Sequence, residues 1–147
     1  MKIEYDNLYI HFVFTTYKRQ PIIPEENRER IEKYITGIIK NKGSKLYAIF
    51  ANPEHVHLLI SCSPSLSFES LASIIANSSE AYINANNLTN DTFKWQQSAS
   101  AFSISKKDVN KVCKYILNQP EHHRKTNYAK EYERFLKHYQ NTLKRVK

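Results

Sequence analysis

The segment from Asn52 to Cys62 leaves the fewest structural options of any part of the chain. After the turn residues Asn52-Pro53, the side chains alternate between the two faces of a strand. One face is apolar and can pack on a core: Val56, Leu58, Ile60 and Cys62. The other face carries His55 and His57, and two neighbouring imidazoles on a rigid surface form half of a site for a divalent metal ion. A half-exposed strand that carries two histidines by chance fits the same pattern.

The rest of the chain predicts three further strands and four helices. Strands are predicted from alternating β-forming residues, and helices from apolar residues three and four positions apart. The chain begins with strand 8–16, a helix that Pro24 can open and Gly43 can end, and strand 45–51. The histidine strand follows, then a helix capped by Ser67 and a short strand region within 93–104. The last two elements are a helix over about 109–119, capped by Asp108, and a helix that begins at Thr126 or Asn127. The first six elements match the ferredoxin-like βαββαβ pattern, an α+β fold with an antiparallel sheet, here followed by additional C-terminal helices.

This fold places the first and third strands side by side in the centre of the sheet. The even residues of strand 8–16 would then face the two helices together with Val56 and Leu58. Tyr9 and His11 would share the opposite, open face with His55 and His57. We therefore expect the chemistry of the protein on this open face.

The third helix is expected to display a tyrosine. Its buried stripe consists of apolar residues: Val109, Val112, Cys113, Ile116 and Leu117. Tyr115 and Gln119 lie together on one flank, one turn apart and off this stripe. A phenol is a poor nucleophile at neutral pH, but nearby cations or a metal ion favour its phenolate. An exposed tyrosine without a task is the alternative interpretation.

Composition limits the class of protein. With 147 residues, 41% hydrophobic and 12% aromatic, the chain is expected to be one packed domain over residues 1–147. It has no apolar run of the length that a membrane span needs and no signal-peptide pattern, so a cytoplasmic location and no membrane partner are expected. Cys62 and Cys113 fit small core residues better than a disulfide or a zinc site.

Positive charge gathers in the last quarter of the chain. Residues 1–110 hold 12 Lys and Arg against 11 Asp and Glu, whereas residues 111–147 hold 10 against 3. This distribution favours a polyanionic partner, with nucleic acid first, although a basic face that only keeps the protein soluble has the same composition.

These motifs resemble a known family. His55-Val56-His57 is similar to the His–hydrophobic–His motif of HUH single-strand endonucleases, and Tyr115-Ile116-Leu117-Asn118-Gln119 is similar to the nucleophile helix of one-tyrosine transposases of the IS200/IS605 type. Trp95-Gln96, the segment 101–105 and the segment 121–125 most resemble the branch that includes the REP-associated tyrosine transposases. The resemblance extends from about residue 5 to residue 137. Ser98-Ala99 departs from it, at a place where relatives tend to carry a glycine-containing stretch.

The resemblance implies a role for each matching residue. Tyr115 would be the nucleophile, and would cleave single-stranded DNA beside a hairpin to give a 5′-phosphotyrosine and a free 3′-OH. His55, His57 and Gln119 would hold one Mg²⁺ or Mn²⁺ as cofactor. A homodimer is expected, acting in a prokaryotic cytoplasm and associated with the nucleoid during the reaction.

Other residues are weaker candidates. Lys18, Arg19, Lys111, Lys114, Arg124 and Lys125 could contact DNA phosphates, or could be solvated surface. Bases could stack on Tyr17 or Trp95 unless these belong to the core. His11 could hydrogen-bond a metal ligand from behind, and a plain strand histidine is the alternative.

Two other functions compete with a transposase. A ferredoxin-like sheet also serves as an RNA-binding platform, but the strands lack the aromatic and glycine pattern of such modules. A domesticated endonuclease with the same chemistry, which no longer moves its own gene, would carry the same residues.

Overall fold

The computed structural model describes residues 1–119 and residue 130, and the chain divides into two compact units, Met1–Leu117 and Asn118–Lys147. The first unit holds the predicted sheet and the tyrosine helix. The predicted fourth helix, together with Arg124 and Lys125, lies outside the described residues, and the single domain over 1–147 stays a prediction. Within the part described, no helix has the length and apolar character to cross a membrane.

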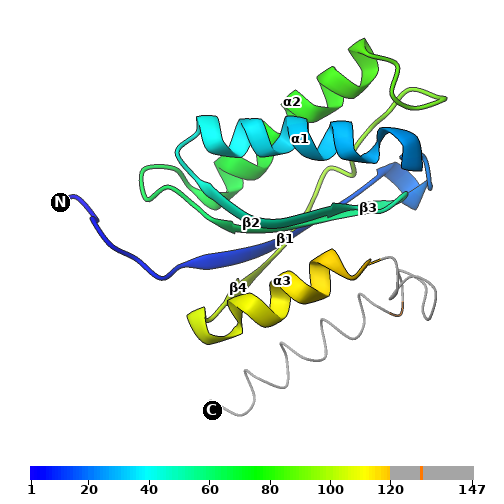
Figure 1. The fold of residues 1–147 in the computed structure, drawn as a ribbon. Helices are drawn as coiled ribbons and strands as arrows, with labels where there is room; N and C mark the ends of the chain where they lie inside the picture. Colours follow the sequence, from blue (N-terminus) through cyan, green and yellow to red (C-terminus); the bar gives the residue numbers. More distant parts are fainter. Residues whose placement is uncertain (120–129, 131–147) are drawn as a thin grey trace. The chain divides into compact units, whose positions relative to one another are not determined.

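The first unit is built on a four-stranded antiparallel sheet in the order β2-β3-β1-β4 (Figure 1). The strands are β1 (Tyr9–Thr15), β2 (Lys45–Ala51), β3 (His55–Ser61) and β4 (Ser100–Ile104), joined to the short turns η1 (Tyr17–Arg19) and η2 (Lys106–Asp108). Helices α1 (Glu25–Asn41) and α2 (Phe68–Ala85) lie on one face, and α3 (Val109–Leu117) lies on the other (Figure 1). The predicted ferredoxin-like fold, with β1 and β3 in the centre, is confirmed.

The main core lies between the sheet and the first two helices. The even residues of β1 and β3 enter it as predicted, with the apolar stripes of α1 and α2: Phe12, Phe14, Val56, Leu58, Ile60, Ile31, Ile35, Ile39, Leu71, Ile75 and Ile83. A second, smaller apolar layer lies on the α3 side of the sheet. Val13, Ala48, Leu59, Ile104 and Ile116 are buried there and are not part of the main cluster.

Several helix ends follow the predicted chemistry. Ser67 caps α2, and its hydroxyl accepts the N–H of Ser70 at 3.0 Å. Gly43 has φ +73°, directly after the C-terminal cap of α1, where glycine avoids the strain that a side chain would cause. Pro24 is the N-cap and not the first helical residue, and Asp108 ends η2, where its carboxylate accepts the Ser105 hydroxyl at 3.0 Å.

The region around Phe93 and Trp95 differs from the prediction. It forms no strand of its own, and Trp95 makes only an isolated bridge to Thr16 before β4 begins at Ser100. The side chains explain this, because Phe93 and Trp95 are both buried and their rings meet edge to face at 4.8 Å. The segment therefore closes the end of the core and does not extend the sheet.

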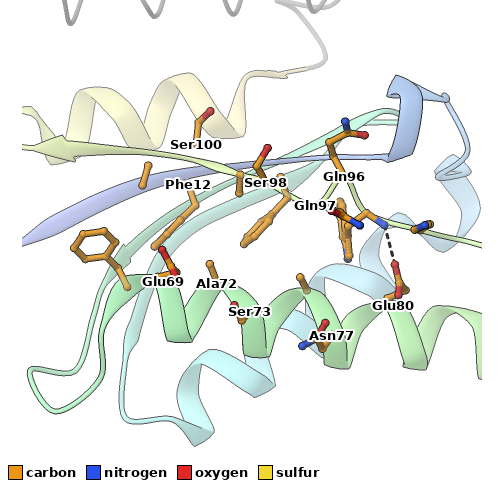
Figure 2. Close-up of a pocket in the computed structure, with 17 residues that line it drawn as sticks. Phe12, Glu69, Ala72, Ser73, Asn77, Glu80, Gln96, Gln97, Ser98 and Ser100 are labelled. Carbon is orange, nitrogen blue, oxygen red and sulfur yellow. Dashed lines mark hydrogen bonds between the residues drawn. The ribbon is translucent and has the colours of Figure 1, made fainter.

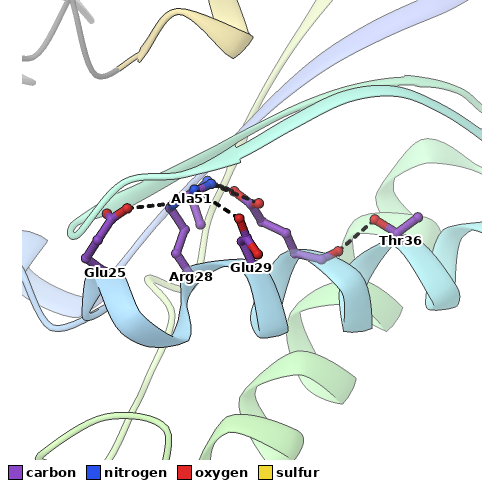
Figure 3. A network of polar contacts seen from close by, with 6 residues as sticks. Glu25, Arg28, Glu29, Thr36 and Ala51 are labelled. Carbon is purple, nitrogen blue, oxygen red and sulfur yellow. Dashed lines mark hydrogen bonds and ion pairs between the residues drawn. The ribbon is translucent and has the colours of Figure 1, made fainter.

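A polar network ties α1 to the outer strand β2 (Figure 3). Glu32 accepts the backbone N–H of Ala51 at 2.9 Å and an Arg28 N–H at 2.9 Å, and Arg28 also contacts Glu25 at 3.3 Å. Burial raises the pKa of the Glu32 carboxyl, and the Ala51 N–H and Arg28 offset this only in part. The Glu32 carboxylate thus accepts a backbone N–H of the edge strand β2, but its own charge is partly buried.

Glu32 makes the stability of the fold depend on pH. Since its pKa is raised in the folded state, its contribution is greatest below its ordinary pKa and falls as the pH rises through the raised value. We expect Glu32→Gln to remove this dependence while it still accepts the Ala51 N–H. Glu32→Ala should lower the free energy of unfolding by about 1–3 kcal/mol, because a buried N–H loses its partner. Urea unfolding of the three proteins across a pH series measures both effects, and equal stability of the Gln and Ala variants would contradict them.

Candidate active site

Strands β1 and β3 bring three histidines to the α3 side of the sheet. The antiparallel register pairs Val13 with His57, and His11 with Leu59, so these side chains share one face. His11, His55 and His57 are each no more than 1% exposed. The predicted grouping of His11 with the His55–His57 pair is confirmed.

The three imidazoles form a continuous row of short contacts. His11 Nε2 lies 2.9 Å from His57 Nδ1, and His57 Nε2 lies 3.0 Å from His55 Nε2. His55 Nδ1 lies 2.8 Å from a carboxylate oxygen of Glu54. Each ring is therefore held in orientation by its neighbours.

The contact between the two Nε2 atoms fits a shared metal ion. Metal–ligand bonds of about 2.1 Å at a right angle place two donor atoms about 3.0 Å apart, the separation expected around an octahedral ion. With both Nε2 atoms as ligands, His57 Nδ1–H would donate to His11, and His55 Nδ1–H would donate to Glu54. Such outer partners usually fix the rings of ligating histidines. In the part of the chain that the structure describes, no group of three His, Cys, Asp or Glu side chains that could hold a metal ion is found.

Two polar neighbours of His55 were missed by the sequence analysis. Glu54 is one, and the other is Asn52, whose Nδ2 lies 3.3 Å from His55 Nε2. Both precede His55 in the turn that the sequence marked only as Asn-Pro. Their closeness in sequence to the histidine motif was the available signal, but residues next to one another in a strand normally point to opposite faces.

Helix α3 places Tyr115 beside the histidine row. The helix packs on β2 and β3 through buried Ile116, and the Cys113 thiol lies 3.9 Å from the Tyr47 carbonyl oxygen. The Tyr115 ring meets the His57 ring edge to face, with centroids 6.0 Å apart. Tyr115 and the histidines thus belong to one chain and one compact unit.

The prediction that Leu117 belongs to the buried stripe of α3 is wrong, since its side chain is 60% exposed.

The predicted cations are distributed unevenly. Lys111 and Lys114 are exposed on α3, and Lys18 and Arg19 are exposed in η1, shortly after β1. Gln119 belongs to the second unit, so its role beside the histidines stays a prediction. Of the two aromatic candidates, Trp95 is a core residue at 5% exposure, with its indole N–H bonded to Ser79, whereas Tyr17 is 40% exposed.

A cavity of about 760 Å³ lies on the opposite side of the sheet (Figure 2). Its walls are one side of α2 and the segment 94–101, and its floor includes Phe12 and Phe14 of the core face. Glu80, in its wall, accepts the Trp95 N–H at 2.9 Å. Since Phe12 and Phe14 point away from the histidines, this cavity is separate from the candidate site.

A four-stranded ferredoxin-like sheet, with paired histidines on the face that α3 covers, makes this an α+β protein built on a single antiparallel sheet. Comparison with known families then identifies the chain. The family described as "Transposase IS200 like" matches residues 4–119, and the chain belongs to this family of transposases.

Two solved structures share the fold. One is a candidate transposase from Deinococcus radiodurans R1, with a TM-score of 0.62 and 19% identity over 81% of this chain and 98% of that one. The other is a REP-associated tyrosine transposase bound to a REP hairpin, with a TM-score of 0.60 and 17% identity over 84% of this chain and 72% of that one. No curated protein matches significantly.

The contact between His11 and His57 predicts a measurable contribution to stability. His11→Ala leaves a buried nitrogen of His57 without this partner, and we expect the free energy of unfolding to fall by about 1–3 kcal/mol. His11→Gln, which carries a polar atom at a comparable distance from the backbone, should recover much of the loss. His11→Phe serves as the control for ring volume, and a Phe variant as stable as the wild type in chemical unfolding would refute the importance of the hydrogen bond.

Proposed function

We propose that this transposase cuts and rejoins single-stranded DNA at hairpin-flanked sites through a covalent bond to Tyr115. The observation that carries the proposal is the position of the Tyr115 ring. Its centroid lies 6.0 Å from that of His57, and His57 Nε2 lies 3.0 Å from His55 Nε2. Membership of a transposase family supports DNA strand transfer as the reaction. The similar structure that holds a REP hairpin supports hairpin DNA as the substrate.

His55, His57 and Gln119 are the residues that would hold Mg²⁺ or Mn²⁺. The 3.0 Å separation of the two Nε2 atoms fits one ion, and the amide of Gln119 would add an oxygen ligand. Three protein ligands leave further positions for water and phosphate oxygens, as in catalytic rather than structural sites. When bound, the ion supplies Lewis-acid stabilisation of the charge that develops on the scissile phosphate.

The role of Tyr115 follows from its chemistry. Its phenolic oxygen attacks the phosphorus, the bond from phosphorus to the 3′ oxygen breaks, the phenol loses a proton and the departing 3′ oxygen gains one. The 5′ phosphate is then attached to Tyr115, so the energy of the phosphodiester bond is kept. Attack by the 3′-OH of another strand reverses these steps and joins the DNA without ATP.

Cationic side chains provide sites for the DNA backbone. Lys111 lies one turn from Tyr115 on α3 and, with Lys114, is exposed where a phosphate beside the nucleophile can be bound. Arg124 and Lys125 extend this basic segment in the sequence, and Lys18 and Arg19 offer contacts at η1. We also expect a homodimer, on the basis of the family resemblance.

The central experiment mixes the protein with Mg²⁺ or Mn²⁺ and single-stranded DNA from both flanks of its gene. A protein–DNA adduct that survives denaturation is expected with the wild type. It should be lost in Tyr115→Phe, which keeps the ring beside His57, and reduced at least 100-fold in His57→Ala. Tyr5, an exposed tyrosine that precedes β1, gives the control Tyr5→Phe, which should form the adduct normally. DNA binding without any metal-dependent adduct would instead indicate a non-catalytic binding module.

Metal binding can be measured without DNA. Titration with Mn²⁺, followed by the loss of the electron paramagnetic resonance signal of the free ion, should give one tight site per chain. His57→Ala should abolish this site, whereas Glu54→Gln and His11→Ala should weaken it about 10- to 100-fold, because they remove the partners of the ligating rings. His122→Ala is the control for a histidine outside the motif. Unchanged Mn²⁺ affinity in His57→Ala would overturn the assignment.

A further inference from the structure

The turn η1, directly after β1, has an unusual backbone. Lys18 and Arg19 follow one another with φ values of 56° and 54°, in the left-handed region that residues with a side chain seldom adopt. Strained conformations of this kind persist only where the surrounding structure imposes them, and they are concentrated at functional sites. The question is what holds this turn and what it presents.

Hydrogen bonds within the turn and from the segment before β4 hold the turn in place. Within it, the Thr16 hydroxyl donates to the Gln20 carbonyl at 2.7 Å, and the Arg19 N–H donates to the Thr16 carbonyl at 2.9 Å. From the segment before β4, the Lys94 carbonyl accepts the Tyr17 N–H at 2.9 Å, and the Gln96 side-chain oxygen accepts the Lys18 N–H at 3.2 Å. The turn is thus a rigid platform and not a loose surface loop.

This platform presents an aromatic ring with two cations close to it. The Tyr17 ring is 40% exposed, and its centroid lies 5.4 Å from the Lys18 ammonium and 4.8 Å from the Lys94 ammonium. An accessible ring with flanking lysines is the combination by which proteins bind unpaired nucleotides: the ring stacks on a base, and the cations contact phosphates. The lysine side chains are flexible, so a phosphate can draw the ammonium groups away from the ring.

The platform is linked directly to the histidine site. Thr15, the residue before Thr16, pairs with His55 across the sheet. The Thr16 N–H donates to the Glu54 carbonyl at 3.0 Å, and the Glu54 carboxylate contacts His55 at 2.8 Å. The ring-bearing turn therefore begins within two residues of the strand position opposite His55.

We propose that Tyr17, Lys18 and Lys94 form a subsite for one unpaired nucleotide adjacent to the scissile phosphate. The base stacks on Tyr17, and the two lysines bind the phosphates on either side of that nucleotide. The inference rests on the proposed function, since it takes the cleaved strand to run past His55. It adds a recognition element for single-stranded DNA that is independent of both the metal ion and Tyr115.

Binding in the absence of metal tests the subsite apart from catalysis. The probe is a fluorescently labelled oligothymidylate, measured by anisotropy in EDTA. Tyr17→Ala should weaken binding about 5- to 150-fold, and Tyr17→Phe should bind within about twofold of the wild type, because the ring remains. Lys94→Gln should lower the slope of log affinity against log salt by about 0.7, the value of one phosphate contact to a single strand.

Matched controls lie at the opposite end of β1. Tyr5 is 87% exposed ahead of this strand, and Lys106 is exposed just after Ile104, the β4 residue that pairs with Tyr9. Tyr5→Ala and Lys106→Gln should leave both the affinity and the salt slope unchanged. If Tyr17→Ala weakens binding no more than Tyr5→Ala does, the subsite is overturned.

The location of the nucleotide is tested with DNA from the flanks of the gene. An abasic residue is placed at successive positions beside the cleavage point. In the wild type, an abasic residue at one position next to the cleavage point should weaken binding. The same abasic residue should have no further effect on binding by Tyr17→Ala. A dependence on Tyr17 that maps far from the cleavage point would refute the adjacency.

The outcome is distinguishable from a failure of the proposed function. If the wild type forms the metal-dependent adduct but the affinity for DNA does not depend on Tyr17, the proposal of the subsite is refuted and the proposed cleavage chemistry is retained. If binding depends on Tyr17 but no adduct forms, the platform belongs to a binding protein, and the proposal of a subsite beside a scissile phosphate is overturned.

Discussion

The pairing of β1 with β3 is the constraint on which the rest of the structure depends. In an antiparallel pair, the register decides which side chains share a face, and a shift of one residue would send each side chain to the opposite face. Here the register places Phe12, Phe14, Val56 and Leu58 in the main core. The burial of these residues therefore also assigns the histidines to one face, because a shift of one residue that moved His11 or His57 to the other face would expose part of the core.

Much of the fold and site could be predicted because both depend on periodicity. Alternation along two strands is enough to assign His11, His55 and His57 to one face, and the order of elements gives the neighbours in the sheet. The flank of α3 that carries Tyr115 follows from its helical spacing, and the contact with His57 agrees with it. These features need no knowledge of side-chain conformation.

The details that the sequence did not predict depend on tertiary contacts. Glu54 reaches the ring of the next residue because the backbone turns at the start of β3, and no periodic pattern contains that information. Leu117 fits the apolar stripe of α3 but lies at its last position, where the helix ends and the sheet no longer covers it. The sequence predicts Trp95 as a strand residue, but its indole N–H donates to Ser79 on α2, and the segment packs into the core.

The left-handed turn at Lys18 and Arg19 has an evolutionary consequence. The whole chain contains only two glycines, and neither lies in this turn, although glycine would adopt the backbone without steric strain. Each residue with a side chain in this region costs about 1–2 kcal/mol. The protein is accordingly less stable than a simple change to glycine would make it. Selection for thermal stability alone would favour that change, so the turn is a position where stability and the proposed nucleotide subsite oppose one another.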